Sequence, residues 1–414
     1  MTDPLTTGLS ALPQEASAFA SFQAAWRFYA NPRTTLPVLI EPLQQVAQQW
    51  RPQAAATAWA LVIHDWSSLK YAAHHSKTDQ TCLSHEADWG YELTTLLLVD
   101  GGTGDPVAPL ELRLRTARAV YSTRTPGPKK TAFRIDEVLS SMRAIAPWGL
   151  GPVVHVIDRE ADSLGHYRQW QEAGQQFLVR ADDARKVRWQ GEALSLTQVA
   201  RRLRRRGAFQ RSRAVQYRGQ DAVQHVAETT VVLDRPAWKH RRRGGRTVHE
   251  RVPGPPLTLR LIVSRVCNAR GETAAVWYLL TNVPAEVPAA TLALWYYWRW
   301  RIESFFKLLK GAGQQLEHWQ QETGLAIAKR LLVAAMACVV VWRLERQTAP
   351  PADEVRALLV RLSGRLMKRG QSYTAPALLA GLWVLVAALE ALERHSVAEL
   401  RRMKELILSG EDTG

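Results

Sequence analysis

The sequence predicts an α/β protein that carries a basic, β-rich insertion and has helical ends. Three observations lead to this prediction. Residues 58–180 alternate strand-like and helix-like patterns, residues 181–285 are strand-like and rich in arginine, and the residues from 286 onward form apolar helical runs. Because strands followed by a helix and a further strand are typical of an α/β sheet, we expect the first stretch to begin the core.

The chain of 414 residues is long enough for two or three domains, or for one interrupted domain. We expect the domain boundaries to fall where the pattern of apolar and charged residues changes. The expected regions are a helical N-terminal region at 1–57, the first part of the core at 58–180, the insertion at 181–285, the second part of the core at 286–345, and a helical C-terminal region at 346–414.

The charge balance is strongly basic. The chain has 54 Lys and Arg against 38 Asp and Glu, a formal net charge of +16. An excess of this size favours a polyanionic partner, because neutralised phosphates release condensed counterions. A soluble Arg-rich protein without such a partner is the alternative. Two clusters, at 201–213 and 239–246, concentrate the arginines within the insertion.

The cysteines and the N-terminus indicate a chain that stays in a reducing cytoplasm. Cys82, Cys267 and Cys338 are odd in number and far apart, so neither a disulfide framework nor a Cys-rich zinc site is expected. The opening MTDPLTTGLS has an acid where a signal peptide needs a base. The apolar runs at 331–342 and 375–389 are shorter than a membrane span of roughly 20 residues, so we expect two buried helices and no membrane partner.

Two aspartates follow apolar runs that read as core strands. Asp65 follows WALVIH and Asp158 follows VVHVI, which places each at the C-terminal end of a predicted strand, the usual edge for ligand sites in α/β sheets. A single aspartate at such a place is more often a cap or a turn residue. His64 and His155 lack a second His or Cys at ligand spacing and are predicted to be core or edge histidines.

The next two acids after Asp158 have a structural interpretation. Glu160 and Asp162 stand where a helix is predicted to begin, and acids in a first turn stabilise the helix dipole.

The stretch WYYWRWRIESFFKLLKGAG, beginning at residue 295, predicts one helix over 295–310 with two different faces. At about 100° per residue, four polar residues share one stripe roughly 60° wide: Tyr296, Arg299, Glu303 and Lys310. The opposite side carries apolar residues typical of a packing face: Trp298, Ile302, Phe305 and Leu309. A merely solvated face would be a looser mixture of charges.

Phosphoryl transfer supplies a chemical reason for the polar face. Two divalent cations activate the attacking oxygen and steady the leaving one, and a few carboxylates hold them. Asp65, Asp158 and Glu303 would suffice as ligands. The remaining polar residues of the stripe would then hold nucleic-acid phosphates. The arginine can bind a phosphate with two parallel N–H donors, and the lysine offers a compact positive charge.

These motifs resemble those of bacterial DDE transposases of the insertion-sequence-four family. The spacing of Tyr296, Arg299, Glu303 and Lys310 is the family's Y-R-E-K signature, and IHDWSSLKY and IDREADS resemble its two aspartate blocks. The blocks occur in the family's order, with a β insertion before the Glu, and the similarity spans roughly residues 16–345.

The resemblance implies an RNase H-like catalytic core and cut-and-paste transposition through a hairpin at the transposon end. It implies Asp65, Asp158 and Glu303 as catalytic metal ligands for two Mg²⁺ ions, with Mn²⁺ as a substitute. It also implies that Arg180 contacts end phosphates and that Trp277 stacks on a flipped base. The implied partners are the inverted-repeat ends, target DNA and a second copy of the chain, in a nucleoid-associated bacterial protein.

The match departs from the family at the N-terminus. Family members usually begin with a longer basic helical region that reads the inverted repeats, and no such stretch precedes LPQEASAFASFQAAW. We therefore expect a shortened DNA-binding region at 1–57. Two alternatives stay open: a truncated transposase that binds DNA or dimerises as an inhibitor, and an RNase H-like nuclease without strand transfer.

Overall fold

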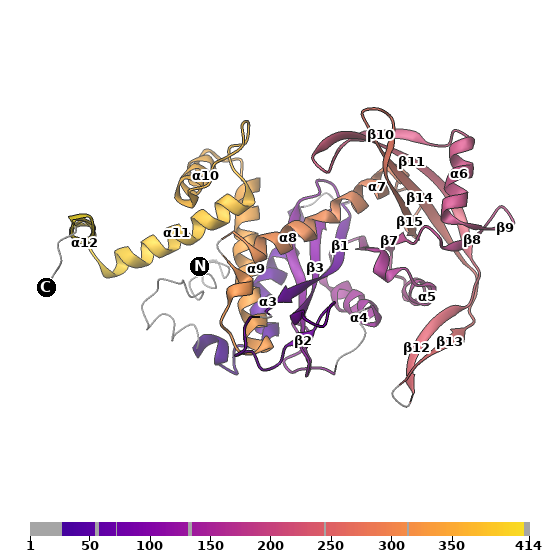
Figure 1. Ribbon diagram of the computed structural model, residues 1–414. Coiled ribbons are helices and arrows are strands. Elements are labelled where there is room, and N and C mark those ends of the chain that lie inside the picture. Colours follow the sequence, from indigo (N-terminus) through magenta and orange to yellow (C-terminus); the bar gives the residue numbers. More distant parts are fainter. Residues whose placement is uncertain are drawn as a thin grey trace. The chain divides into compact units, whose positions relative to one another are not determined.

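The computed structural model describes residues 27–53, 58–71, 73–130, 135–243, 246–312 and 314–409. Figure 1 labels the helices and strands. The chain forms two compact units. We call residues 44–68 and 92–304 the sheet unit, and the described parts of 1–43, 69–91 and 305–414 the helical unit.

A sheet of 13 strands dominates the sheet unit, with the ends of β1 and β3 and the short β2 counted to the helical unit. Its strands are β1 (Ala60–Lys70), β2 (Thr81–Cys82), β3 (Trp89–Asp100), β4 (Pro106–Arg115), β5 (Val120–Ser122), β6 (Val153–Ile157), β7 (Phe177–Ala181), β8 (Lys186–Trp189), β9 (Glu192–Ser195), β10 (Gln210–Tyr217), β11 (Gln220–Leu233), β14 (Leu257–Asn268) and β15 (Thr273–Thr281). Their order is β5-β4-β3-β1-β6-β7-β15-β14-β11-β8-β9, with β2 on β3 and β10 on β11.

The first half of this sheet is the RNase H-like core that the sequence predicts. In the order β4-β3-β1-β6-β7, β3 and β4 are antiparallel, whereas β1, β6 and β7 are parallel neighbours. The central strands are apolar over nearly their whole length, as in β6 (VVHVI), because both faces of a parallel sheet are covered. The α/β class is therefore confirmed.

The register of β1 and β6 determines where the two predicted aspartates lie. The paired residues run from Ala60↔Val153 to His64↔Ile157, so Asp65 and Asp158 are the next residues on two neighbouring parallel strands. The expectation that β1 ends at Asp65 is wrong: the strand continues to Lys70. It continues because this part of the chain stays beside β3, where Tyr71 N donates to Trp89 O (2.9 Å).

The basic, β-rich segment joins the same sheet. The hairpin predicted around NARGE is β14 and β15, and β15 pairs with β7. The first Arg cluster begins on α6 (Leu196–Arg205), whose start is closed by a capping box between Ser195 and Gln198. The second cluster lies on a separate two-stranded hairpin, β12 (Ala237–Arg243) and β13 (Arg246–Val252); residues 244–245 lie outside the described residues.

Both units contain helices. They are α3 (Leu36–Gln53), α4 (Asp136–Ile145), α5 (Leu164–Glu172), α6, α7 (Ala289–Trp298), α8 (Trp300–Lys310), α9 (Gly324–Arg346), α10 (Pro350–Ser363), α11 (Ala375–Arg394) and α12 (Val397–Ser409). Short 3₁₀ turns are η1 (Ala146–Trp148), η2 (Arg159–Ala161) and η3 (Leu316–His318).

The single helix expected over 295–310 is instead two helices, α7 and α8, separated at Arg299. The chain tightens there into an i→i+3 bond, from Arg299 N to Tyr296 O (3.1 Å), and a further one from Ile302 N to Arg299 O (3.2 Å). Arg299 keeps right-handed helical dihedrals (φ −50°, ψ −31°), so the interruption is mild.

The helical unit contains both predicted apolar helices, and only one of them is buried. Within 18-residue windows, α9 is 78% buried and α11 is 22% buried. The expectation of a buried helix at 375–389 is therefore wrong, since Val384, Leu389 and Leu392 are exposed. Among the described residues these two helices, of 23 and 20 residues, are long and apolar enough to cross a membrane by length and composition alone.

Two close contacts hold the helical unit together. Lys329 on α9 donates from Nζ to the carbonyl oxygens of Tyr29 (2.7 Å) and Asn31 (3.0 Å), which anchors the first described residues. Gly381 on α11 lies so near α10 that a Cβ there would come within 1.9 Å of Leu359 O. Only glycine permits this approach of the two helices.

Candidate active site

Arg299 is the centre of a cluster of three carboxylates from distant parts of the sheet unit. Its Nη1 donates to Asp65 Oδ2 (2.7 Å) and its Nη2 donates to Glu303 Oε1 (2.9 Å). Nη2 also lies 3.4 Å from Asp158 Oδ2. The guanidinium is nearly enclosed, with 6% of the side chain exposed, whereas the three carboxylates are 16–31% exposed. One buried cation thus joins all three predicted catalytic acids.

Each aspartate of the cluster is also held by the chain beside it. Asp65 Oδ1 accepts from Trp66 N (2.8 Å). Asp158 caps η2, where its Oδ1 accepts from Arg159 N (2.7 Å), and it accepts a second bond from the Tyr296 hydroxyl (2.9 Å). These bonds fix the orientation of both carboxylates before any ligand binds.

The environment separates the proton affinities of the two aspartates. Burial raises the pKa of Asp65 to about 6, against the opposing effect of the Arg299 guanidinium. Burial also acts to raise the pKa of Asp158, but Arg299, Arg159 N, the Tyr296 hydroxyl and Arg180 together hold it below its ordinary value. For Arg299 itself, burial disfavours the charge, yet Tyr296 and the three carboxylates raise its pKa.

Arg180 and Trp277 lie beside this cluster. Arg180, on β7, places Nη1 3.7 Å from Asp158 Oδ1. Trp277, on β15, is only 8% exposed and contacts two tyrosine rings, with centroids 6.0 Å from Tyr296 and 6.2 Å from Tyr217. The structure therefore brings together all but one of the residues predicted for the site.

The remaining predicted residue, Lys310, belongs to the helical unit, where its Nζ lies 3.6 Å from Glu317 Oε1. Two neighbouring residues, Trp300 and Arg301, had no predicted role. Trp300 is 49% exposed, with its ring 5.7 Å from the Arg299 guanidinium. Arg301 donates from Nε to Gly104 O (2.8 Å) and so fixes the start of α8.

The two histidines next to the aspartates form a buried pair. His64 Nε2 and His155 Nδ1 are 2.9 Å apart, and each residue is 1% exposed. Burial lowers the pKa of both, that of His155 to about 3, so both rings are neutral at physiological pH. The prediction of core histidines is confirmed.

Asp162 is also structural, although its contacts differ from those expected. Its carboxylate accepts from the Tyr167 hydroxyl (2.7 Å), from Asp182 N (2.8 Å) and from Arg185 Nε (2.6 Å), so it ties α5 to the residues after β7. The Glu160 carboxylate accepts a hydrogen bond from Nε1 of Trp66, a residue of β1 (2.9 Å).

The carboxylate oxygens of the cluster are suitable ligands for a hard divalent cation. In this structure, however, these oxygens are oriented toward the guanidinium of Arg299. Carboxylate oxygens are the ligands that Mg²⁺ and Mn²⁺ take in proteins. Within the described ranges, however, no group of three or more His, Cys, Asp or Glu side chains forms a ready-made metal cluster. The three acids surround a guanidinium, and a metal would need the same oxygens.

A family comparison bears on this arrangement. The model of the family described as Transposase DDE domain matches residues 118–340, more than half of the chain. The chain belongs to this DDE transposase family. The matched segment contains Asp158, Arg299 and Glu303, and Asp65 precedes it. No curated protein sequence matches the chain. DNA is therefore the partner of this transposase, and DNA cleavage and strand transfer are the class of activity that the domain indicates.

Sequence reasoning missed the ionic role of Arg299. A signal for part of it was present, since Arg299 and Glu303 have the i,i+4 spacing of a helical ion pair. The two aspartates that complete the cluster are 234 and 141 residues away along the chain, so no local pattern links them to Arg299.

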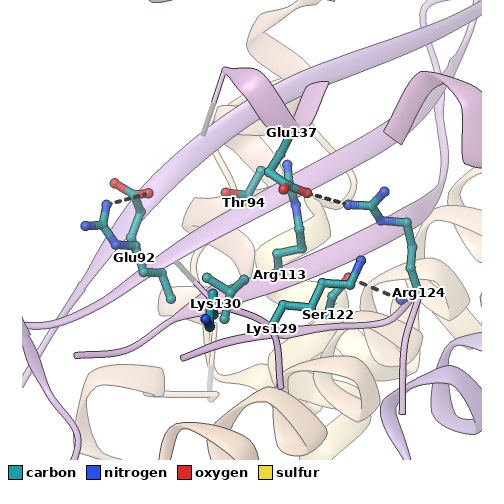
Figure 2. Close-up of a pocket in the computed structure, with 10 residues that line it drawn as sticks. Glu92, Thr94, Arg113, Ser122, Arg124, Lys129, Lys130 and Glu137 are labelled. Carbon is teal, nitrogen blue, oxygen red and sulfur yellow. Dashed lines mark hydrogen bonds and ion pairs between the residues drawn. The ribbon is translucent and has the colours of Figure 1, made fainter. Parts of the chain in front are cut away.

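The transposase has a second charged cluster on the other face of the sheet, shown in Figure 2. Arg113 lies near enough to His64 to lower its pKa, and Asp65, the next residue of β1, points to the opposite face. In this pocket Glu137 lies between Arg124 (2.9 Å) and Arg113 (3.3 Å). Lys129 and Lys130 lie at its exposed edge.

Four charged residues at this pocket form a compact ionic network. Arg113 and Arg124 each also place Nε 3.0 Å from Glu111 Oε1, and Glu111 is 1% exposed. Two cations and two anions, Arg113, Arg124, Glu111 and Glu137, thus compensate one another. The network joins β4, the residues that follow β5, and α4.

Replacing Glu137 by Gln tests the structural role of this network. The variant leaves Arg113, 5% exposed, without one of its two anions, and we expect a loss of roughly 2 kcal/mol in the free energy of unfolding. Urea denaturation measures it. The matched control is Glu192→Gln, which breaks the exposed pair with Arg202 and should change little. Equal stability of the two variants would contradict the network.

Proposed function

We propose that this protein is a cut-and-paste transposase of the insertion-sequence-four family, in which Asp65, Asp158 and Glu303 hold two Mg²⁺ or Mn²⁺ ions. The observation that carries the proposal is the convergence of these three carboxylates on one guanidinium in a chain of the DDE transposase family. The Y-R-E-K spacing at Tyr296, Arg299, Glu303 and Lys310 supports the narrower family.

The ions would supply what carboxylates alone lack. When bound, they would lower the pKa of the attacking water or 3′-hydroxyl and neutralise charge on the phosphate. The protein's part is orientation: Trp66 N and Arg159 N hold the two aspartates, and α8 presents Glu303 beside them. In this proposal water cuts the first strand, and the freed 3′-hydroxyl attacks the opposite strand to close a hairpin.

The cationic residues predicted from the sequence motifs would hold the DNA backbone. Arg180 is 34% exposed beside Asp158 and can take a phosphate without leaving its place. Arg299 could offer its fork to a phosphate, and Lys310 a point charge. Tyr296 hydrogen-bonds Asp158 and would position that carboxylate as well as the DNA.

Trp277 is proposed to stack on the base that is flipped when the hairpin forms. Aromatic stacking is a sequence-tolerant way to hold an extruded base. Because the Trp277 side chain is 8% exposed and contacts the rings of Tyr217 and Tyr296, neighbouring side chains would have to move to admit the base.

Two ends must be cut and joined, so we propose a homodimer that brings two active sites together on transposon and target DNA. The exposed apolar side of α11, with Val384, Leu389 and Leu392, offers a surface for the second copy.

We propose that this assembly works in the bacterial cytoplasm on the nucleoid. The Arg clusters at 201–213 and 239–246 would grip the DNA backbone.

Loss of any one ligand should abolish the chemistry. We expect Asp65→Asn, Asp158→Asn and Glu303→Gln each to slow strand cleavage on the cognate element ends by at least about a thousandfold, because each removes several kcal/mol of charge stabilisation. Glu172→Gln, at the exposed end of α5, is the control. Full activity of one triad variant would exclude that residue. Nicks without hairpins or joined ends would favour a plain nuclease.

The arginines of α6 should contribute to DNA affinity and to its dependence on salt concentration. Replacing Arg204 and Arg205, both exposed, by Gln should weaken binding to every DNA sequence. If each contacts one phosphate, the slope of log K against log salt should fall by about 2. Fluorescence anisotropy over a salt series measures it, with Arg361→Gln and Arg365→Gln as the matched pair. An unchanged slope would make α6 a solvated face.

The oligomeric state should depend on α11. We expect Leu389→Lys with Leu392→Lys to convert a dimer into a monomer, as measured by light scattering, because two charges would have to be buried in the interface. Leu366→Lys, at a residue 99% exposed, is the control and should leave the dimer intact. A wild-type monomer that sediments with lipid vesicles through these leucines would assign α11 to a membrane instead.

A further inference from the structure

We infer that Arg299 is an internal cation of the metal-free protein, exchanged for divalent ions when a DNA phosphate draws its guanidinium away. This inference rests on the proposed metal site, and it adds a coupling between DNA binding and metal binding that the proposed function does not contain. Arg299 acts here as a positioning residue.

The guanidinium of Arg299 and a divalent cation would compete for the same carboxylate oxygens. Each carboxylate turns one oxygen to the guanidinium: Oδ2 of Asp65 (2.7 Å), Oε1 of Glu303 (2.9 Å) and Oδ2 of Asp158 (3.4 Å). A divalent cation needs the same oxygens. Metal binding therefore requires these oxygens to be released from the guanidinium.

The charges of the cluster also require a cation. Three carboxylates gathered at one edge of a sheet repel one another, and a cation among them is needed when no metal is present. The Arg299 side chain is 6% exposed, so its charge is stable only while anions surround it. It can leave the carboxylates only for another anion, and a phosphate matches the guanidinium fork.

The two rings near the guanidinium differ in their exposure to solvent. The Cζ of Arg299 lies 5.9 Å from the ring of Tyr296 and 5.7 Å from the ring of Trp300. Tyr296 is 2% exposed, whereas Trp300 is 49% exposed. The open side of Arg299 is therefore the side of Trp300. A DNA backbone arriving there would meet the guanidinium without displacing buried side chains.

The consequence is a reciprocal linkage between the two ligands. If DNA removes the competitor of the metal, DNA raises metal affinity, and the metal raises DNA affinity by the same factor. The ions would then be bound weakly without DNA, which would keep the site from hydrolysing other phosphodiesters.

The test measures Mn²⁺ binding to the full chain by the paramagnetic resonance signal of free Mn²⁺. Without DNA, Arg299→Gln should bind Mn²⁺ at least about tenfold more tightly than the wild type, and Arg299→Lys should fall between them. A purely structural arginine would give the opposite sign, because its loss would disorder the ligands. Lys307→Gln, which removes one positive charge at an exposed residue of the same helix, should bind as the wild type does.

A short blunt-ended DNA duplex supplies the second arm. It should raise the Mn²⁺ affinity of the wild type and leave that of Arg299→Gln unchanged. Equal Mn²⁺ affinity of the wild type and Arg299→Gln would overturn the inference, and so would an undiminished DNA effect in the variant. Should Arg299→Gln fail to fold by circular dichroism, Arg299→Lys decides: tighter binding than the wild type supports the exchange, and equal binding overturns it.

One further variant separates this inference from the proposed function. If Asp158→Asn binds Mn²⁺ as the wild type does, the carboxylates are not the metal site and both proposals fail. If Asp158→Asn loses Mn²⁺ while Arg299→Gln matches the wild type, the metal site stands and only the exchange fails.

Discussion

The ion pairing of Arg299 with Asp65, Asp158 and Glu303 is the interaction on which the site depends. Carboxylates from β1, from the end of β6 and from α8 meet at one nearly enclosed guanidinium. Burial works against this charge, and only the surrounding anions make it favourable. Even with the cation present, burial raises the pKa of Asp65 to about 6, and the neighbouring carboxylates of Asp158 and Glu303 add a smaller increase.

The sheet supplies the second constraint, because the parallel register of β1 and β6 brings two acids together before any helix contributes. The last register pair is His64↔Ile157, so the residues that follow emerge side by side. β6 stops there, and the Asp158 side chain closes the next turn by accepting from Arg159 N. The strand that carries Asp65 runs on along β3, which keeps that carboxylate at a rigid position rather than on a loop.

Much of this could be predicted from the sequence, because strand ends, helices and hairpins have local signals. The apolar runs before Asp65 and Asp158 and the hairpin around NARGE were such signals, and helical period placed Arg299 and Glu303 on one face. Tertiary facts had no local signal. The continuation of β1 depends on β3, the interruption at Arg299 on packing, and the exposure of α11 on which surfaces its neighbours cover.

The two charged clusters of the sheet unit show what separates a reactive arrangement from a structural one. Arg113, Arg124, Glu111 and Glu137 balance to zero, and Glu111 and Arg113 are almost fully enclosed. Around Arg299, three carboxylates face two guanidiniums, Arg299 and Arg180, which leaves a formal charge of −1 when all are ionised. These carboxylates are also 16–31% exposed. Because the negative charge around Arg299 is not fully neutralised and is accessible to solvent, binding of another cation would stabilise this site. The network of Arg113, Arg124, Glu111 and Glu137 is already neutral, so a further cation would not stabilise it.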